Sequence, residues 1–387
     1  MKRTGTGFLL DRQSHVRPSG LLAWRVLGVV GVLLVAVVVS WGRATPSDAG
    51  ACRHPAGQYE GGAAGKGRDP LFEQQWGLRR INAPAAWKQG ATGKGAVIAV
   101  LDGGVDLSHP DLRKKLVKGM DFAVTPGCDG PQDEDGHGTH VAGIAAANTN
   151  NGIGIAGVAP DAKIMPVRVL GLEDAAQNNG AVTEAVSKGI RYAADHGAEV
   201  INMSFTIFPL VENPTSAQAV SDAIKHAWKK GVVLVAAAGN DFVLPCEYPA
   251  SDPMVLCVGA VDRDGMHSWY GSPLVKSEPR LTLSAPGGSL AANFDCASDE
   301  GVWSTVLPGP EYSCGTSGYI SWVGTSMASP HVAGVAALLA AEGLSNEEIV
   351  ECLTATALNP HTGQRGQFDP VYGYGEVDAA AAVEQCS

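Results

Sequence analysis

Three short motifs place an acid, a base and a nucleophile in that order along the chain. Asp102 ends an apolar run at residues 99–101 and precedes two glycines. His137 stands in Asp-Gly-His-Gly-Thr-His-Val-Ala-Gly, and Ser326 stands in Gly-Thr-Ser-Met-Ala-Ser-Pro-His-Val-Ala-Gly. A serine hydroxyl can attack an amide when an imidazole takes its proton and a carboxylate orients that imidazole. The motifs therefore predict acyl transfer, with Asp102, His137 and Ser326 as the catalytic residues.

Each of these residues has a simpler interpretation when it is taken singly. An aspartate after a strand is usually a turn residue, and a serine before a helix is usually an N-cap. His137 and His140 are spaced like metal ligands, but the glutamate of a His-Glu-x-x-His zinc site is missing. The order and length of the motifs favour the catalytic interpretation. We assign His140 and His331 to structural hydrogen bonds.

The elements that must position these residues follow from the hydrophobic pattern. Apolar, β-branched runs predict strands at residues 97–102, 164–169, 199–205, 232–237 and 255–261, and helical patterns occupy 140–147, 182–196 and 217–230. This alternation predicts an α/β fold of three α/β/α layers with a mostly parallel central sheet. Ligands of such folds bind beyond the carboxyl ends of the strands, where Asp102, Ser204 and Asn240 are expected.

Ser326 opens an alanine-rich stretch that predicts a further helix. A serine at a helix N-terminus lies beside backbone N–H groups that can stabilise a developing oxyanion. Pro330 follows closely, and we expect it in the first turn, which tolerates a missing N–H. The helix start would thus supply both the nucleophile and part of its electrostatic support.

The motifs and their order resemble those of the subtilisin-like serine peptidases, or subtilases, across residues 69–385. The resemblance implies a subtilisin-like fold and serine endopeptidase activity on proteins or peptides. It implies that Asp102 orients the imidazole, that His137 is the general base and acid, and that Ser326 is the nucleophile. Asn240 matches the side-chain oxyanion donor of the family.

Two other functions stand beside that of a general exported endopeptidase. One is a processing protease held at a membrane, which would cut a few exported proteins. The other is a catalytically inactive module that captures peptides in its cleft. The complete set of acid, base, nucleophile and oxyanion donor argues against the inactive module.

Two positions depart from the family pattern. Gly103 follows the catalytic aspartate where relatives usually have serine or threonine, so one hydrogen bond to the carboxylate is expected to be lost. The substrate-cleft motif reads Ser204-Phe205-Thr206, where relatives usually end in glycine. We expect this segment to bind an extended substrate as a strand, with Thr206 altering the specificity pocket.

The resemblance also implies a structural calcium ion. Its ligands would be the Asp111 carboxylate, the Asn151 amide, the carbonyls of Thr149, Ile153 and Ile155, and Asp69, which matches an N-terminal ligand in some relatives. Hard oxygen donors of this kind suit Ca²⁺. The alternative is an Asn/Gly-rich loop that folds without metal. No catalytic cofactor is expected.

The chain divides into four segments. Residues 1–20 are basic, residues 21–41 are apolar, residues 42–68 form a Gly/Pro-rich linker, and the peptidase domain spans 69–387. The apolar segment is long enough to cross a bilayer as an uncleaved anchor, but a signal peptide cut near Ala44 is the competing interpretation. Both interpretations place the peptidase domain outside the membrane, because basic residues hold the N-terminus inside.

Charge and cysteine content agree with an exported enzyme. The formal charge is −11, with +5 on residues 1–43 and −16 on the remainder, which argues against nucleic acid as a partner. We expect a monomer. Eight cysteines follow the apolar segment, and an even count outside the cytoplasm indicates disulfides. Nearest-neighbour pairing predicts Cys52–Cys128, Cys246–Cys257, Cys296–Cys314 and Cys352–Cys386.

Overall fold

The computed structural model describes most of the chain after the linker. The described residues are 59, 67–123, 130–171, 179–207, 214–242, 245–274, 281–289, 298–309 and 318–387. Within these ranges, every helix is too short or too polar to cross a membrane. The predicted anchor or signal at 21–41 lies outside the described residues, as do Cys52, Cys128, Cys296 and Cys314.

Seven parallel strands form the central sheet, in the order β2-β3-β1-β4-β5-β6-β7. The strands are β1 (Val97–Asp102), β2 (Met120–Asp121), β3 (Lys163–Arg168), β4 (Val200–Met203), β5 (Val233–Ala237), β6 (Val255–Val261) and β7 (Thr282–Pro286). Most strand residues are buried on both faces, which explains why the sequence shows continuous apolar runs in place of alternation. The predicted parallel sheet is confirmed.

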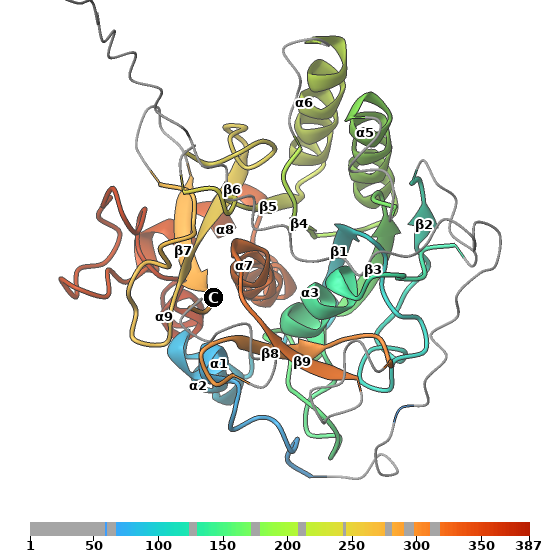
Figure 1. The fold of residues 1–387 in the computed structure, drawn as a ribbon. Helices are drawn as coiled ribbons and strands as arrows, with labels where there is room; N and C mark the ends of the chain where they lie inside the picture. Colours follow the sequence, from blue (N-terminus) through green and yellow to red (C-terminus); the bar gives the residue numbers. More distant parts are fainter. Residues whose placement is uncertain are drawn as a thin grey trace, which may run out of the picture. The chain divides into compact units, whose positions relative to one another are not determined.

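Helices cover both faces of the sheet (Figure 1). On one face lie α3 (His137–Ala146) and α7 (Thr325–Ala341), and on the other lie α5 (Asn179–Asp195) and α6 (Pro214–Lys229). The side chains of β1 alternate between two cores, with Val100 packed in the α3/α7 core and Leu101 in the α5/α6 core. The predicted three-layer α/β/α architecture is therefore confirmed.

The remaining elements lie around this centre. They are α1 (Trp76–Arg80), α2 (Ala83–Lys88), α8 (Asn346–Thr356), α9 (Ala379–Cys386) and an antiparallel hairpin of β8 (Val302–Thr305) and β9 (Tyr319–Trp322). The hairpin packs against α3. Its strand β9 ends three residues before α7 begins, so it leads directly into the helix that carries Ser326.

The sheet order brings three predicted site residues to one edge. Strand β1 has β3 on one side and β4 on the other, so the connections diverge at β1 and leave space beyond its carboxyl end. Asp102 is the last residue of β1, Ser204 follows β4, and Asn240 follows β5 after a short turn.

Two expectations about the helices α3 and α7 differ from the structure for physical reasons. The helix expected at 140–147 begins at His137, because two aspartates accept the N–H groups of its first turn. Pro330 lies in the second turn of α7 and not in the first. The expectation for Pro330 was wrong, and the carbonyl that loses its helical N–H donor needs another partner.

Two disulfides link described cysteines, Cys246 to Cys257 and Cys352 to Cys386. Both pairs match the nearest-neighbour prediction, which is confirmed for these four residues. Cys246–Cys257 ties the loop after β5 to the buried strand β6, and Cys352–Cys386 ties α8 to α9.

Candidate active site

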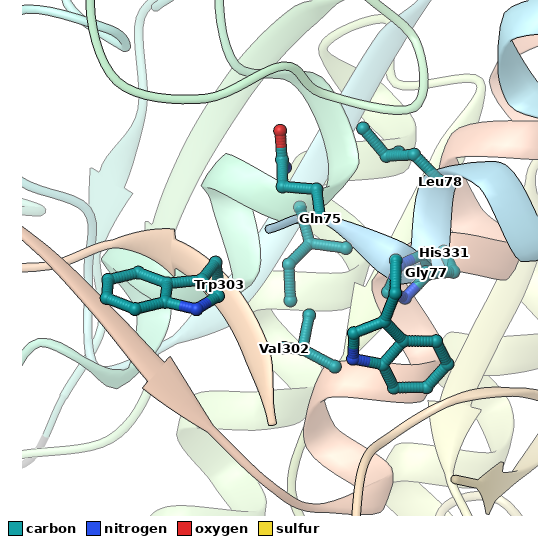
Figure 2. Close-up of a pocket in the computed structure, with 8 residues that line it drawn as sticks. Gln75, Gly77, Leu78, Val302, Trp303 and His331 are labelled. Atoms are coloured by element: carbon teal, nitrogen blue, oxygen red, sulfur yellow. The ribbon is translucent and has the colours of Figure 1, made fainter. Parts of the chain in front are cut away.

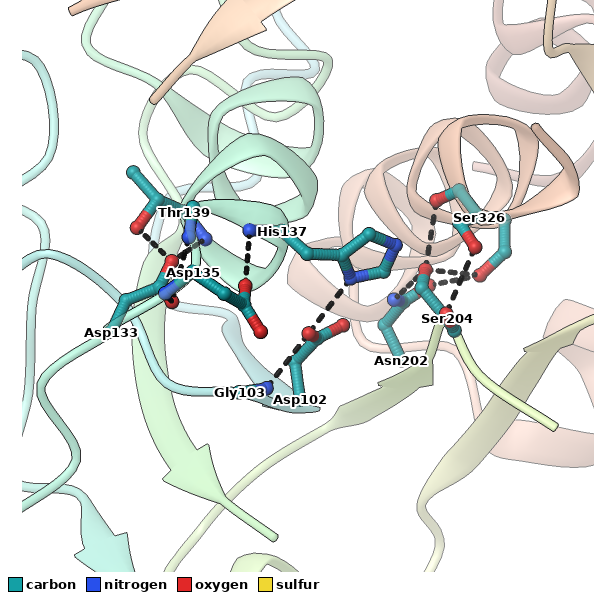
Figure 3. Close-up of polar contacts among 11 residues, drawn as sticks. Asp102, Gly103, Asp133, Asp135, His137, Thr139, Asn202, Ser204 and Ser326 are labelled. Carbon is teal, nitrogen blue, oxygen red and sulfur yellow. Dashed lines mark hydrogen bonds and ion pairs between the residues drawn. The ribbon is translucent and has the colours of Figure 1, made fainter. Parts of the chain in front are cut away.

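The base side of the site joins the end of β1 to the start of α3. The Nδ1 of His137 lies 2.8 Å from Oδ1 of Asp102, which also accepts the backbone N–H of Gly103 at 2.8 Å (Figure 3). Asp102 is 1% exposed and the His137 side chain is 29% exposed. A Cβ on Gly138 would collide with the Gly104 carbonyl. Only glycine there allows α3 to approach β1 closely enough for this contact.

Nearby carboxylates set the proton affinity of His137. Burial disfavours the charged imidazole, but the Asp102 carboxylate and then those of Asp135 and Asp133 outweigh burial and raise the pKa of His137. His140 lies one turn later in α3, and its Nε2 is 3.2 Å from the Ile320 carbonyl. Burial lowers the pKa of His140 to about 3, so this ring is neutral.

Two aspartates that the sequence analysis did not single out hold the start of α3. Asp133 accepts the N–H groups of Asp135, Gly136 and Thr139 and the Thr139 hydroxyl. Asp135 accepts the His137 N–H at 2.7 Å. The signal was present in the sequence, because acidic residues before a helix commonly bind its unpaired N–H groups.

The nucleophile side joins the end of β4 to α7 through a reciprocal pair of hydrogen bonds. The Ser326 hydroxyl donates to the Ser204 carbonyl at 2.9 Å, and the Ser204 hydroxyl donates to the Ser326 carbonyl at 2.8 Å. The Ser326 carbonyl is the group that Pro330, four residues later, cannot serve. Ser204 therefore supplies the missing donor and fixes the first turn of α7.

A buried polar network supports this pair. The side-chain amide of Asn202 donates through Nδ2 to the Ser204 hydroxyl at 2.9 Å. Its Oδ1 accepts a hydrogen bond from the Ser329 hydroxyl. The Ser204 side chain is thus directed toward α7. Its neighbours Phe205 and Thr206 follow after the end of β4. In this structure the Ser204 hydroxyl is an internal anchor.

Asn240 and the start of α7 form a donor pair. The Asn240 Oδ1 accepts the Thr325 N–H at 3.0 Å and the Thr325 hydroxyl at 2.9 Å, which leaves its Nδ2 as a donor. A Cβ on Gly324 would lie 3.7 Å from the Ser326 N and 3.8 Å from the Asn240 Nδ2. Both donors therefore lie close to one point beside Gly324, and an oxyanion site needs two donors near one position.

The residues predicted to bind calcium gather at the loop 149–155. Asp111 accepts the Asn151 amide at 2.6 Å, the Ile155 N–H at 3.2 Å and the Tyr319 hydroxyl at 2.8 Å. Asp69 accepts three consecutive N–H groups, those of residues 150–152. Asp69 therefore holds the loop in shape.

The carbonyl groups of this loop are the better donors for a metal ion. Those of Thr149, Ile153 and Ile155 accept no hydrogen bond from any residue that the structure describes. Ile155 is fully buried. Nowhere in the described ranges do three His, Cys, Asp or Glu side chains gather closely enough to bind a metal. A cation here would depend on neutral oxygens and on Asp111, a donor set that fits Ca²⁺.

A small cavity beside α7 has no part in the site. It lies between α1, α3, β8 and α7, and is lined among others by Trp76, Trp303 and His331 (Figure 2). Its volume is about 10 Å³, which is room for one water molecule at most. A peptide cannot enter it.

The fold and the site define a class of protein. A parallel α/β/α sheet carries a buried Asp–His pair, a serine at a helix start and two oxyanion donors at its carboxyl edge. This arrangement belongs to serine hydrolases of the subtilisin type.

Comparison with known proteins agrees with that class. A family model described as the subtilase family matches residues 93–375, and the chain belongs to this family. It is 41% identical to thermitase of Thermoactinomyces vulgaris over 294 residues, which cover 75% of this chain and 90% of thermitase. It is 37% identical to subtilisin BL of Lederbergia lenta, with 80% and 98% of the two chains covered.

A solved structure supports the same assignment. A protease from Pseudoalteromonas arctica aligns with a TM-score of 0.65 and 32% identity, covering 83% of this chain and all of that one. The chain is accordingly a serine endopeptidase with the subtilisin-like fold, and protein or peptide substrates follow from the family.

Proposed function

We propose that this chain is an exported endopeptidase that cleaves peptide bonds through Asp102, His137 and Ser326. The observation that carries the proposal is the 2.8 Å contact between Asp102 and His137, with the imidazole directed toward Ser326 (Figure 3). Asp102 holds the ring so that Nδ1 keeps its proton and Nε2 is the base. Ser326 turns from the Ser204 carbonyl to His137 when substrate binds, a tightening that is common in unliganded sites.

The reaction follows from these positions. The Ser326 oxygen attacks the scissile carbonyl carbon while its proton passes to His137 Nε2, and the carbonyl oxygen becomes an oxyanion. The Asn240 amide and the Ser326 N–H stabilise that charge. His137 then gives the proton to the leaving amine, and an acyl-enzyme remains. Water attacks the acyl-enzyme by the same steps and releases Ser326.

The segment Ser204-Phe205-Thr206 is proposed to bind the substrate as an added strand. It follows the end of β4, beyond the last residue that pairs with β5. An extended peptide can take up such unpaired backbone groups. The Thr206 hydroxyl donates a hydrogen bond to the Glu247 carboxylate. We therefore expect Thr206 to make the substrate site polar at this position.

Replacement of Ser326 by alanine tests the proposed triad. We expect Ser326→Ala to lose casein hydrolysis and labelling by a fluorophosphonate, while its thermal melt stays close to that of the wild type. Ser187→Ala is the matched control, because it removes a hydroxyl from α5, on the other face of the sheet. Normal turnover by Ser326→Ala would exclude the assignment and leave the inactive peptide-binding module or another nucleophile.

We propose that a calcium ion stabilises the loop 149–155. The Asp111 carboxylate, the Asn151 amide and the carbonyls of Thr149, Ile153 and Ile155 would hold it, and Asp69 would hold the loop backbone. When bound, the ion would offset the charge of Asp111, whose pKa burial raises to about 6. It would have no part in the chemistry.

Thermal melts with calcium and with a chelator test this site. A ligand present at ~100 times its dissociation constant adds ~2.7 kcal/mol to the stability of the native state. We expect calcium to raise the melting temperature of the wild type by several degrees and to have a much smaller effect on Asp111→Asn. Asp161→Asn, at an exposed position, is the control for lost charge. Equal melts of the wild type with and without chelator would contradict the proposal.

Export is proposed from residues 21–41 and from the disulfides. Two described disulfides indicate an oxidising compartment, and the apolar segment with basic residues before it can direct the domain across a membrane. Sequencing the N-terminus of the mature protein separates the two modes. A full-length species in washed membranes would support the anchor, and a start near Thr45 would support a cleaved signal.

A further inference from the structure

The position after the catalytic aspartate is occupied by a neighbour's carboxylate. A Cβ on Gly103 would lie 2.9 Å from Oδ2 of Asp135 and 3.4 Å from its Oδ1. Gly103 does not have a left-handed φ, so its backbone alone would accept any residue. The absence of a side chain at Gly103 is what makes room for Asp135.

The same Asp135 carboxylate also holds the backbone of His137. Oδ1 of Asp135 accepts the backbone N–H of His137 at 2.7 Å. The far oxygen of Asp102, Oδ2, is buried and has no hydrogen-bond partner among the described residues. A serine or threonine at position 103 was expected to donate a hydrogen bond to Asp102, and glycine cannot do so. The carboxylate of Asp102 therefore orients His137 through one oxygen, and the Asp135 carboxylate lies where a side chain on Gly103 would be.

The charges around His137 favour a second anionic partner. His137 is the first residue of α3, where the positive end of the helix disfavours an imidazolium. Around it lie Asp102 from β1, Asp133 and Asp135 from the preceding loop, the neutral His140 of α3, and the Trp322 ring of β9. The Arg168 guanidinium of β3 is paired with Asp121 and with Glu134 of the same loop.

We propose that Asp135 is a positioning residue that stabilises the His137 imidazolium formed during catalysis, and that Gly103 is its required partner. The inference rests on the proposed role of His137 as the base. Asp135 fixes the His137 backbone through Oδ1, and its negative charge favours the protonated ring. Burial and Asp133 raise the pKa of Asp135 while His137 lowers it, as expected for two groups that influence each other.

Asp135→Asn separates charge from hydrogen bonding, because an asparagine Oδ1 can still accept the His137 N–H. We expect the acid limb of kcat/KM for a neutral peptide substrate to move to lower pH by roughly 0.5–1 unit. The direction follows because a less stabilised imidazolium loses its proton at lower pH. The plateau rate should fall several-fold, since a weaker base accepts the serine proton less readily.

Glu134→Gln is the matched control. It removes the same charge from the adjacent residue, but Glu134 is directed toward Arg168 at 3.0 Å. We expect this variant to melt at a lower temperature and to keep the acid limb of the wild type. An acid limb that stays in place in Asp135→Asn, whatever happens to the plateau, would overturn the proposal and leave Asp135 as a helix cap.

A double-mutant cycle tests the partnership with Gly103. In the wild-type background, Gly103→Ala should push the Asp135 carboxylate aside and shift the acid limb in the same direction as Asp135→Asn. In the Asp135→Ala background it should have little further effect. Additive effects would contradict the pairing. If His137→Ala remained active, the triad itself would be wrong, and this outcome is distinguishable from an unshifted limb.

Discussion

The two halves of the site are built from different chemical groups. Around His137 stand three aspartates, Asp102, Asp133 and Asp135, whose combined charge raises the pKa of the imidazole. Around Ser326 the contacts are neutral, and the hydroxyls and amides of Ser204, Asn202, Ser329, Thr325 and Asn240 provide them. The two halves are held by separate elements, α3 and α7, which pack side by side (Figure 1).

The difference matches the charges that the reaction creates. In the proposed mechanism a proton arrives at His137, so anionic neighbours stabilise the product of that transfer. A negative charge develops on the substrate oxygen beside Asn240, where a carboxylate would oppose it and neutral N–H donors stabilise it. The buried carboxylate nearest Asn240 in the sequence, that of Glu247, is held by the hydroxyls of Ser272 and Thr206.

Placing a carboxylate on the neutral side should break this arrangement most severely. Asn240→Asp is nearly isosteric, but it replaces the Nδ2 donor by an anionic oxygen. Loss of the donor alone costs about 10²–10³ in kcat in subtilisin, a member of the same family. We expect Asn240→Asp to lose more than Asn240→Ala, with KM little changed in both. Equal activity of the aspartate and alanine variants would show that charge at this position is unimportant.

Removing a charge from the base side should act mainly on the fold of the loop. Asp133 is fully buried and accepts three N–H groups and one hydroxyl. Asp133→Asn would place an amide donor against the donors of Thr139, and we expect it to cost about 3 kcal/mol. Chemical denaturation measures this loss. A stability within 0.5 kcal/mol of the wild type, about the range of surface substitutions, would contradict the assigned hydrogen bonds.

The smallest expected effect is that of the neutral anchor. Ser204→Ala leaves the Ser326 carbonyl without its donor, because Pro330 cannot replace it. We expect a loss of about 1–2 kcal/mol in stability and a fall of roughly tenfold in kcat. The acid limb should not move, since no charge changes. A shift of that limb by Ser204→Ala would show that the two halves are coupled more closely than their contacts indicate.

Local patterns in the sequence were sufficient for much of this structure. Continuous apolar runs gave the strands, since strands buried on both faces need no alternation. Asp102, His137, Ser326 and Asn240 were predicted because each stands in a motif next to a strand end or a helix start. Sequence spacing also gave the pairs Cys246–Cys257 and Cys352–Cys386.

Contacts between distant parts of the chain were not accessible in this way. The Ser204–Ser326 pair joins residues that are 122 apart, and its purpose is visible only once Pro330 is placed in the second turn. The contact of Asp135 with Gly103 depends on how closely α3 approaches β1. The Tyr319 hydroxyl reaches Asp111 across 208 residues. Such contacts are fixed by packing, and no local pattern in the sequence encodes them.

The central claim is that Ser326 is activated by His137. The most direct test is the rate at which a fluorophosphonate modifies the protein, followed by mass spectrometry across a pH series. We expect a single modified residue, Ser326, with a rate that rises as pH increases through the His137 pKa, because only the neutral imidazole can accept the proton. His137→Ala should abolish labelling although Ser326 is present. Labelling of another serine, or undiminished labelling of Ser326 in His137→Ala, would contradict the account.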